Sequence, residues 1–234
     1  LEKENPGIFS DPNQTFVDFY MKSGLYITEI ITRLYTGLSK AIPEKEKRLR
    51  HILEKQVYGF TPSKIIYNIA KSFIFGFLYS DEFQHMSTDI DLSHFVCVDT
   101  VPYAKMEDDI AFRQRMAELF NNQNWENENM KFDNVVGNPP YQDNIENRGE
   151  QPAIYNLFYD LAEKCSIKYC LISPARFLFK VGSTPKLWNA KMLESENLKV
   201  VYFNQNPSEI FPTTDIKGGV AILYYDSQNC IGPI

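Results

Sequence analysis

The sequence FDNVVGNPPYQDN, residues 132–144, combines an apolar strand with a rigid polar turn. Its small apolar residues are followed at once by Asn138, Pro139, Pro140 and Tyr141. The prolines lack an N–H and have a nearly fixed φ, so they hold the strand end stiffly and leave the Pro139 carbonyl as an outward acceptor. The Asn138 amide oxygen is a second acceptor. Two acceptors on a stiff turn can hold the hydrogens of an amino group, while the Tyr141 ring can stack on a flat heterocycle.

Apolar segments of strand length alternate with helical patterns on both sides of this turn. We expect strands near residues 14–21, 56–60, 94–101, 132–136, 168–174, 198–203 and 218–226, and helices over 23–38, 44–53, 61–79, 108–120, 152–165 and 184–196. Thr61 is expected to cap the helix over 61–79, with Pro62 in its first turn. The alternation is typical of the α/β class, a mainly parallel sheet with helices on both faces. Ligands on such sheets bind where strands end and helices begin, which is the position of the turn.

The composition predicts a globular chain without a membrane span. Of 234 residues 44% are hydrophobic, enough for a sizeable core. No window approaches the roughly 18 apolar residues of a membrane helix, and residues 1–14 have no signal-peptide pattern, so we expect a cytoplasmic protein. The net charge of −6 has the wrong sign for a surface that binds nucleic acid throughout, so any DNA contact would be local. No CxxC pairing or metal-binding histidine spacing occurs, and we expect no metal site.

The segment FDNVVGNPPYQ resembles motif IV of the amino-methyltransferases, which transfer a methyl group from S-adenosylmethionine to the exocyclic amino group of adenine in DNA. The resemblance implies a Rossmann-like methyltransferase fold with an antiparallel strand near the C-terminus. It also implies catalytic roles for the four residues of the turn. Asn138 and the Pro139 carbonyl would orient the amino group, Pro140 would stiffen the turn, and Tyr141 would stack on an adenine flipped out of the double helix.

The segment FVDFYMKSGLYITEIITRLY, residues 16–35, resembles the cofactor-binding motif I of a restriction–modification branch of this family. The usual form is Asp-Pro, a few residues, Lys-Ser-Gly and then a helix, and the matching residues are Asp18, Lys22, Ser23 and Gly24. Gly24 permits close approach of the backbone to a cofactor at a helix N-terminus, and Asp18 could bind the methionine amino group. A plain turn between a strand and a helix is the alternative interpretation.

Two further positions belong to the expected cofactor site, and one position departs from the family pattern. Phe19 stands where the family has proline. Thr61 falls where such enzymes often place an acidic residue on the ribose hydroxyls of the cofactor. Asp99 matches the motif III position, where an acidic side chain accepts a hydrogen bond from the adenine amino group of the cofactor; a solvated Asp at a strand end is the alternative.

The later segments QPAIYNLFYDLAEK, YCLISPARFLF and EIFPTTDIKGGVAILYY resemble later conserved blocks of the same branch, so the match extends from about Phe16 to Tyr225. These blocks and the loop before them contain candidate contacts to the flipped base and to DNA phosphates: Phe177, Phe179, Arg148, Arg176, Lys180 and Lys217. Core packing of the two aromatic residues and solvation of the four basic ones are the alternatives.

The resemblance implies one methyltransferase domain over residues 1–234. Within it we expect a surface insertion at 104–131, because this segment contains a polar stretch that is poor in apolar residues. Because the chain starts at Leu1 and stops at NCIGPI, we expect a fragment of a longer bacterial restriction–modification protein. Its target-recognition and nuclease domains would lie outside this sequence. The expected partners are double-stranded DNA with a flipped adenine and those further domains, with no membrane partner.

Two other functions remain open. The NPPY motif also serves methyltransferases that modify RNA bases or the side-chain amide of glutamine in proteins. A non-catalytic DNA-binding module with a degenerate cofactor site is the second alternative, because Phe19, Thr61 and a single glycine depart from the usual cofactor motifs.

Overall fold

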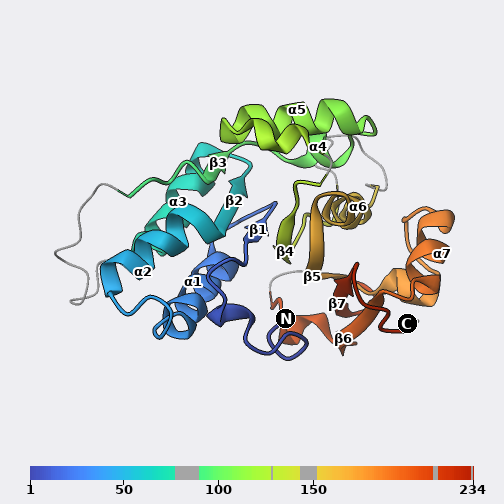
Figure 1. Ribbon diagram of the computed structural model, residues 1–234. Helices are drawn as coiled ribbons and strands as arrows, with labels where there is room; N and C mark the ends of the chain where they lie inside the picture. The colour runs from blue at the N-terminus through green and yellow to red at the C-terminus, as the bar shows by residue number, and fades with distance from the viewer. Residues whose placement is uncertain (77–89, 128, 143–151, 213–215, 233) are drawn as a thin grey trace. The chain divides into compact units, whose positions relative to one another are not determined.

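The computed structural model describes residues 1–76, 90–127, 129–142, 152–212, 216–232 and 234. The chain divides into two compact units, Leu1–Val136 and Gly137–Ile234. Each unit is described by itself below (Figure 1). The expectation of a single domain over 1–234 stays a prediction.

The first unit is built on parallel strands in the order β3-β2-β1-β4. Their bounds are Phe16–Asp18 for β1, Val57–Thr61 for β2, Phe95–Cys97 for β3 and Phe132–Gly137 for β4, whose last residue begins the second unit. Phe16 is in register with Val57 on one side and with Asn134 on the other. The turn after β1 therefore lies beside the end of β2, which carries Thr61, with the end of β3 and Asp99 one strand further along the sheet.

The helices of the first unit are α1 (Leu25–Gly37), α2 (Lys45–His51), α3 (Lys64–Gly76), α4 (Val101–Ala104) and α5 (Asp109–Phe120). A π-helical turn, Ile52–Gln56, follows α2, and short 3-10 helices lie at Ile8–Ser10 and Gln123–Glu126. The helices α1 and α3 contact each other and the strands, and α5 lies on the other side of the strands (Figure 1). The apolar positions of α1 at helical spacing are buried, as the periodicity predicts: Ile27, Ile30, Ile31 and Leu34.

Two local expectations were wrong. Thr61 does not cap α3, because it is the last residue of β2 and the helix begins at Lys64. Ser63 is the capping residue, since its hydroxyl accepts from the N–H of Ile66 at 3.4 Å. The third strand ends at Cys97, and Val101 starts α4 instead of extending that strand.

The segment between β3 and β4 contributes aromatic side chains to the core of the first unit. Trp125 is buried, and its ring centroid lies 4.7 Å from that of Phe132 at the start of β4. Phe120 packs edge-on against Phe60 and Tyr58. These contacts anchor the expected insertion at 104–131 by its aromatic residues.

The second unit contains β5 (Ser166–Pro174), β6 (Leu198–Asn204) and β7 (Val220–Asp226) in the order β5-β7-β6. The strand β7 runs antiparallel to both neighbours, with Ile172 opposite Ile222. Its helices are α6 (Tyr155–Cys165) and α7 (Lys186–Glu194), with 3-10 helices at Arg176–Phe179 and Pro207–Glu209. Parallel strands followed by an antiparallel strand near the C-terminus confirm the expected fold class.

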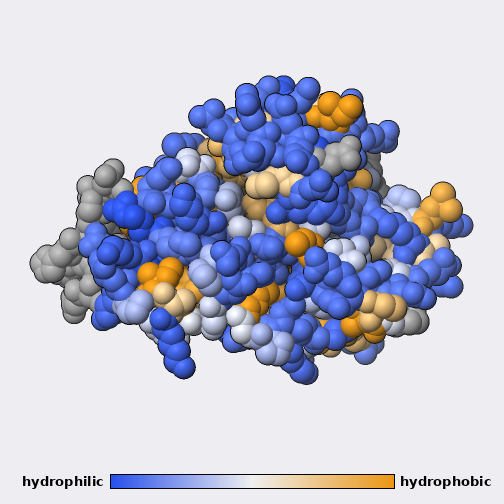
Figure 2. All heavy atoms as spheres, in the orientation of Figure 1, coloured by the Kyte–Doolittle hydropathy of each residue, from blue (hydrophilic) through white to orange (hydrophobic). Residues whose placement is uncertain are grey.

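None of the helices in the described part of the chain is both long and apolar enough to cross a membrane. Most of the face seen in Figure 2 is hydrophilic, and the apolar side chains on it form small separate patches.

Candidate active site

Asp18 ends β1 with its carboxyl buried; only 3% of the residue is exposed. Its Oδ1 accepts from the N–H of Tyr20 at 2.9 Å. Burial raises the pKa of Asp18 to about 7, although the Tyr20 N–H and the nearby Lys22 oppose this rise. A cationic ligand group beside this carboxyl would favour its ionised form, so Asp18 suits the amino group of an amino acid.

The turn after β1 is bonded to β2 and to the segment that follows β3. The N–H of Met21 donates to the carbonyl of Phe60 in β2 at 2.7 Å. The hydroxyl of Thr100, beyond β3, donates to the carbonyl of Phe19. The turn therefore has a defined backbone path across the ends of three strands.

Gly24 is the N-cap of α1 and has a φ of 85°, in the left-handed region that favours glycine. A Cβ at this position would lie 3.3 Å from the Cα and Cβ of Ala70 in α3. The glycine therefore permits close packing of α1 on α3. Lys22 is exposed and Ser23 half-buried just before this helix start, so both belong to the same turn as Asp18.

The other two expected cofactor residues differ in exposure: Asp99 is exposed and Thr61 is buried. Asp99 is exposed beyond β3, and its Oδ1 accepts from the N–H of Val101 at 3.0 Å. Burial, and then the charge of Asp99, raises the pKa of Tyr20, which indicates that Asp99 faces the turn after β1. Thr61 is fully buried, and its hydroxyl donates to the carbonyl of Val96 at 3.4 Å. In this conformation the Thr61 side chain packs within the sheet and is not presented to a cofactor.

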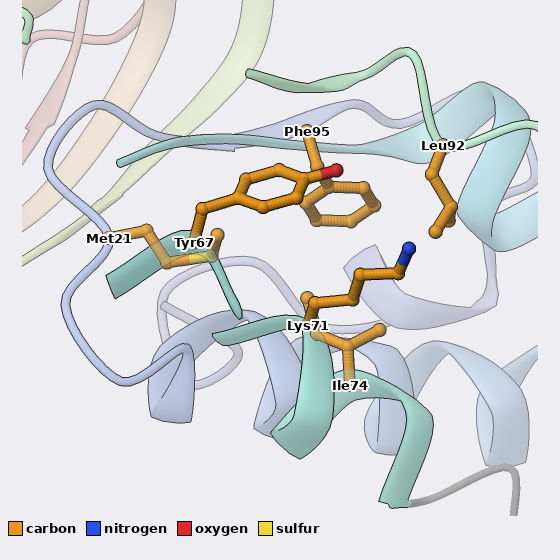
Figure 3. A pocket seen from close by; sticks show the side chains of 6 residues that line it. All are labelled: Met21, Tyr67, Lys71, Ile74, Leu92 and Phe95. Atoms are coloured by element: carbon orange, nitrogen blue, oxygen red, sulfur yellow. The ribbon is translucent and has the colours of Figure 1, made fainter. Parts of the chain in front are cut away.

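A small pocket lies beside this turn but does not include the expected cofactor residues (Figure 3). Its lining is mainly apolar: Met21, Tyr67, Lys71, Ile74, Leu92 and Phe95. Met21 joins the pocket to the turn, and its side chain also lies over Gly59, where an added Cβ would approach the Met21 sulfur to 2.9 Å. We therefore interpret the pocket as space between α3 and β3, distinct from the candidate cofactor site.

The NPPY turn follows β4 directly, as the sequence predicts. Asn138 is 8% exposed, and its side-chain oxygen has no hydrogen-bond partner among the described residues. Buried polar atoms in folded proteins are normally paired, so this acceptor is open to a donor that is not among the described residues. Pro139 is buried and Pro140 half-buried, which keeps the turn rigid.

Tyr141 is held within the second unit by its backbone and by its ring. Its carbonyl accepts from the N–H of Ile154 at 3.1 Å, just before α6. The ring packs against an apolar cluster of Ile172, Ile216 and Val220. Both contacts limit the directions in which the ring can turn.

Phe211 is an aromatic candidate that sequence reasoning missed. It is half-buried and packs against the same apolar cluster as Tyr141. Phe211 is therefore a second aromatic side chain beside the cluster that Tyr141 contacts, and aromatic rings stack on flat heterocycles. The only signal in the sequence was its place in the segment EIFPTTDIKGG, which does not by itself separate Phe211 from an ordinary core residue.

The structure separates the two phenylalanines proposed to contact the base. Phe177 is fully buried, with its ring centroid 5.1 Å from that of Trp188, so it occupies the core. Phe179 is 59% exposed and meets Phe203 edge-on at 5.9 Å. Phe179 therefore remains available to a ligand, whereas Phe177 supports the fold.

Three of the four proposed phosphate contacts lie on the surface of the second unit. Arg176, Lys180 and Lys217, the basic cluster, are all exposed. A Cβ at Gly218 would come within 2.6 Å of the Arg176 Cγ, so the aliphatic part of Arg176 lies across the residue next to Lys217. Arg148 lies outside the described residues.

The fold is that of S-adenosylmethionine-dependent methyltransferases. Its features are parallel strands joined by helices, a helix with an N-cap glycine after β1, and an NPPY turn after β4. The sequence model of the Eco57I restriction-modification methylase family matches residues 55–211, well over half of the chain, and the chain belongs to this family.

Relatives agree with this membership. An uncharacterized adenine-specific methylase of Mycoplasma pneumoniae is 22% identical over 271 aligned residues, which cover 98% of this chain and 64% of that protein. A nuclease-deletion mutant of the Type ISP restriction-modification enzyme LlaGI, solved with a DNA substrate mimic, superimposes with a TM-score of 0.66 at 14% identity over 99% of this chain. The EcoKI M protein of a Type I restriction enzyme gives a TM-score of 0.59 at 10% identity over 97% of this chain.

The chain is shorter than these proteins. It spans 64% of the Mycoplasma protein, 22% of the LlaGI chain and 42% of the EcoKI M protein. At such low identities the structural similarity concerns the fold, and the family match rests on the sequence.

Proposed function

We propose that this chain is the catalytic part of a site-specific DNA adenine methyltransferase of a restriction–modification system. It transfers a methyl group from S-adenosylmethionine to the exocyclic N6 amino group of an adenine flipped out of DNA. The buried side-chain oxygen of Asn138 carries this proposal, because it is an acceptor beside a stiff proline turn and no described residue donates to it. Membership in the Eco57I restriction-modification methylase family supports it.

The catalytic problem is the orientation of a poor nucleophile. The lone pair of an aromatic amine is delocalised into its ring, and the amino group of adenine is paired inside the double helix until the base leaves it. The Asn138 oxygen and the Pro139 carbonyl accept the two amino hydrogens and direct the lone pair toward the methyl donor. Tyr141 stacks on the flipped base, with Phe211 as the second aromatic contact.

The cofactor S-adenosylmethionine supplies an activated methyl group when bound, so the reaction needs no covalent intermediate on the protein. The residues that would hold it are Asp18, Lys22, Ser23, Gly24 and Asp99. Asp18 fits the methionine amino group because a buried carboxyl with a raised pKa is stabilised in its charged form by a cation. Gly24 is the N-cap of α1 and makes no side-chain capping bond, so N–H groups of the first helical turn could bind the carboxylate of the cofactor's methionine part.

The proposal extends to partners. Double-stranded DNA is the substrate, and target-recognition and nuclease functions belong to other parts of the full-length protein. We keep one methyltransferase domain over residues 1–234 and a cytoplasmic bacterial location as predictions.

Methyl transfer tests the proposed function directly. With tritiated S-adenosylmethionine, we expect label in unmethylated DNA and, after digestion of that DNA, in N6-methyladenine. Label that appears only in RNA or in protein glutamine would overturn the choice of substrate while leaving the methyltransferase assignment in place.

Asn138 offers the sharpest variant test of the same proposal. Asn138→Ala removes the acceptor, and we expect a loss in kcat of about 10²-fold, the size seen when one positioned hydrogen bond is lost. Asn138→Asp keeps an acceptor oxygen at this position and should retain more activity than the alanine variant. Equal activity of all three proteins would contradict the role given to the Asn138 oxygen.

The buried position of Thr61 favours a second candidate function, a DNA-binding module that has lost its cofactor. The end of β2 carries Thr61 where related enzymes often carry an acidic residue, and the Thr61 side chain is buried. The expected contact to the ribose hydroxyls of the cofactor is therefore missing. Calorimetric titration of the wild-type chain with S-adenosylmethionine separates the two functions. Binding heat supports the methyltransferase, whereas its absence at millimolar ligand, with DNA binding retained, supports the module.

A further inference from the structure

The turn Phe19–Gly24 lacks the proline that the resembling enzymes carry after the aspartate, yet its backbone is fixed. A proline would restrict φ at position 19. Here Phe19 is buried instead, with its ring stacked on that of Phe60 at a centroid distance of 5.4 Å. The Met21 N–H is bonded to the Phe60 carbonyl, and the Phe19 carbonyl accepts from the hydroxyl of Thr100.

The Thr100 hydroxyl bonds to the distant Phe19 carbonyl instead of capping the helix that it precedes. Thr100 is the N-cap of α4, a position where a threonine hydroxyl commonly accepts from the helix backbone, but its side chain makes no capping bond. The preceding residue performs that task, because Asp99 Oδ1 accepts from the N–H of Val101. The Thr100 hydroxyl is thus directed 81 residues back along the chain, and the residue is only 2% exposed.

The bond joins two turns that each carry a candidate cofactor residue. On one side, the Phe19 carbonyl follows Asp18 immediately; on the other, Thr100 follows Asp99 immediately. A shift of either turn would change the separation of the two carboxylates. A buried bond between the neighbouring residues restricts such a shift.

We propose that Thr100 is a positioning residue that sets Asp18 and Asp99 for the cofactor by bonding the turn after β1 to the turn after β3. The inference rests on the proposed function, because it assigns a role within the same cofactor site. Thr100 itself does not contact the cofactor. Its hydroxyl provides part of the restriction that a proline provides in the motif that this turn resembles.

Thr100→Val is the first test, because valine keeps the shape and removes the hydroxyl. We expect the Kd for S-adenosylmethionine, measured by calorimetric titration well below the Tm, to rise about tenfold, or ~1.4 kcal/mol. Thr100→Ser keeps the hydroxyl, and its Kd should stay within about twofold of the wild-type value. A tenfold rise in the Kd of the serine variant would overturn the inference. The serine variant retains the hydroxyl, so it still provides this test if the valine variant does not fold.

Thr184 provides a matched control in the other unit. It is also a buried threonine whose hydroxyl donates, here to the Asn189 oxygen at 2.7 Å. Thr184→Val should lower the Tm and leave the Kd for S-adenosylmethionine unchanged. If Thr100→Val likewise lowers the Tm without changing the Kd, Thr100 is only structural and the inference fails while the proposed function stands. If the wild-type chain binds no S-adenosylmethionine, the proposed function fails first and the inference with it.

Discussion

At the scale of single residues, Asp18 combines a structural cost with a functional use. Its folded-state pKa of about 7 lies above the ordinary value of 3.8 because the carboxyl is buried. Between these two pH values the unfolded chain releases the proton and the folded chain keeps it. The free energy of unfolding should therefore fall as pH rises from about 4 to about 7. Above that range the contribution of this group should stay constant.

Asp18→Asn tests this cost and use together. Chemical denaturation at pH 5 and pH 8 should show that the variant is stabilised relative to wild type more at pH 8, because asparagine cannot ionise. The wild-type affinity for S-adenosylmethionine should increase from pH 6 to about 7.5, as Asp18 ionises while an α-amino group, with a pKa of about 7.7–8.0, remains charged. The variant should bind more weakly and lose this increase. An unchanged pH profile in the variant would remove Asp18 from the cofactor site.

At the scale of secondary-structure elements, Gly24 determines how closely α1 packs on α3. Gly24→Ala places a Cβ at a φ of 85° and 3.3 Å from Ala70. The left-handed backbone conformation alone costs an alanine about 1–2 kcal/mol. We expect the variant to lose that amount of stability plus a packing contribution, measured by urea denaturation.

Gly7 is the matched control for this element. It has the same φ of 85°, but nothing lies within 4 Å of an added Cβ. Gly7→Ala therefore reports the backbone strain alone, and the difference between the two variants reports the close approach of α1 and α3. Equal losses would mean that α3 yields to the added methyl group.

The elements themselves were largely predictable, because periodicity and strand–helix alternation depend on local sequence. The apolar stripe of α1 and the strands β4, β5 and β7 lie where the pattern predicts them. The errors occurred at boundaries, where Thr61 and Val101 were each assigned to the wrong element. Ser63 and Thr61 are both acceptable capping residues, so only the backbone path selects between them.

At the scale of the whole molecule, the positions of site residues were more predictable than their exposure. The sequence placed candidate residues near the carboxyl ends of β1, β3 and β4, although it extended the first and third strands past Asp18 and Asp99. It could not show that Thr61 and Phe177 are fully buried, because burial depends on distant segments such as the residues around Val96 and Trp188. The Thr100 hydrogen bond was hidden for the same reason, as its partner lies 81 residues away.

The net charge of −6 opposes DNA binding by the chain as a whole, so binding would depend on local clusters of basic residues. If the basic cluster of Arg176, Lys180 and Lys217 contacts three phosphates, the logarithm of the DNA association constant should fall against the logarithm of salt concentration with a slope of about −3. Each substitution by glutamine should reduce the magnitude of that slope by about 1. Glutamine keeps part of the aliphatic stem of Arg176 that lies across Gly218, which limits the loss of packing.

Lys47 provides the control for this electrostatic prediction. It is an exposed lysine of the first unit paired with Glu44 at 2.7 Å, so Lys47→Gln should leave the salt slope unchanged if only the cluster contacts DNA. Fluorescence anisotropy with a labelled duplex at several salt concentrations measures all the variants. A triple variant of the cluster that keeps the wild-type slope would show that phosphates bind elsewhere. A lower slope with unchanged affinity for S-adenosylmethionine would assign the cluster to DNA alone, because the variants then retain the folded cofactor site.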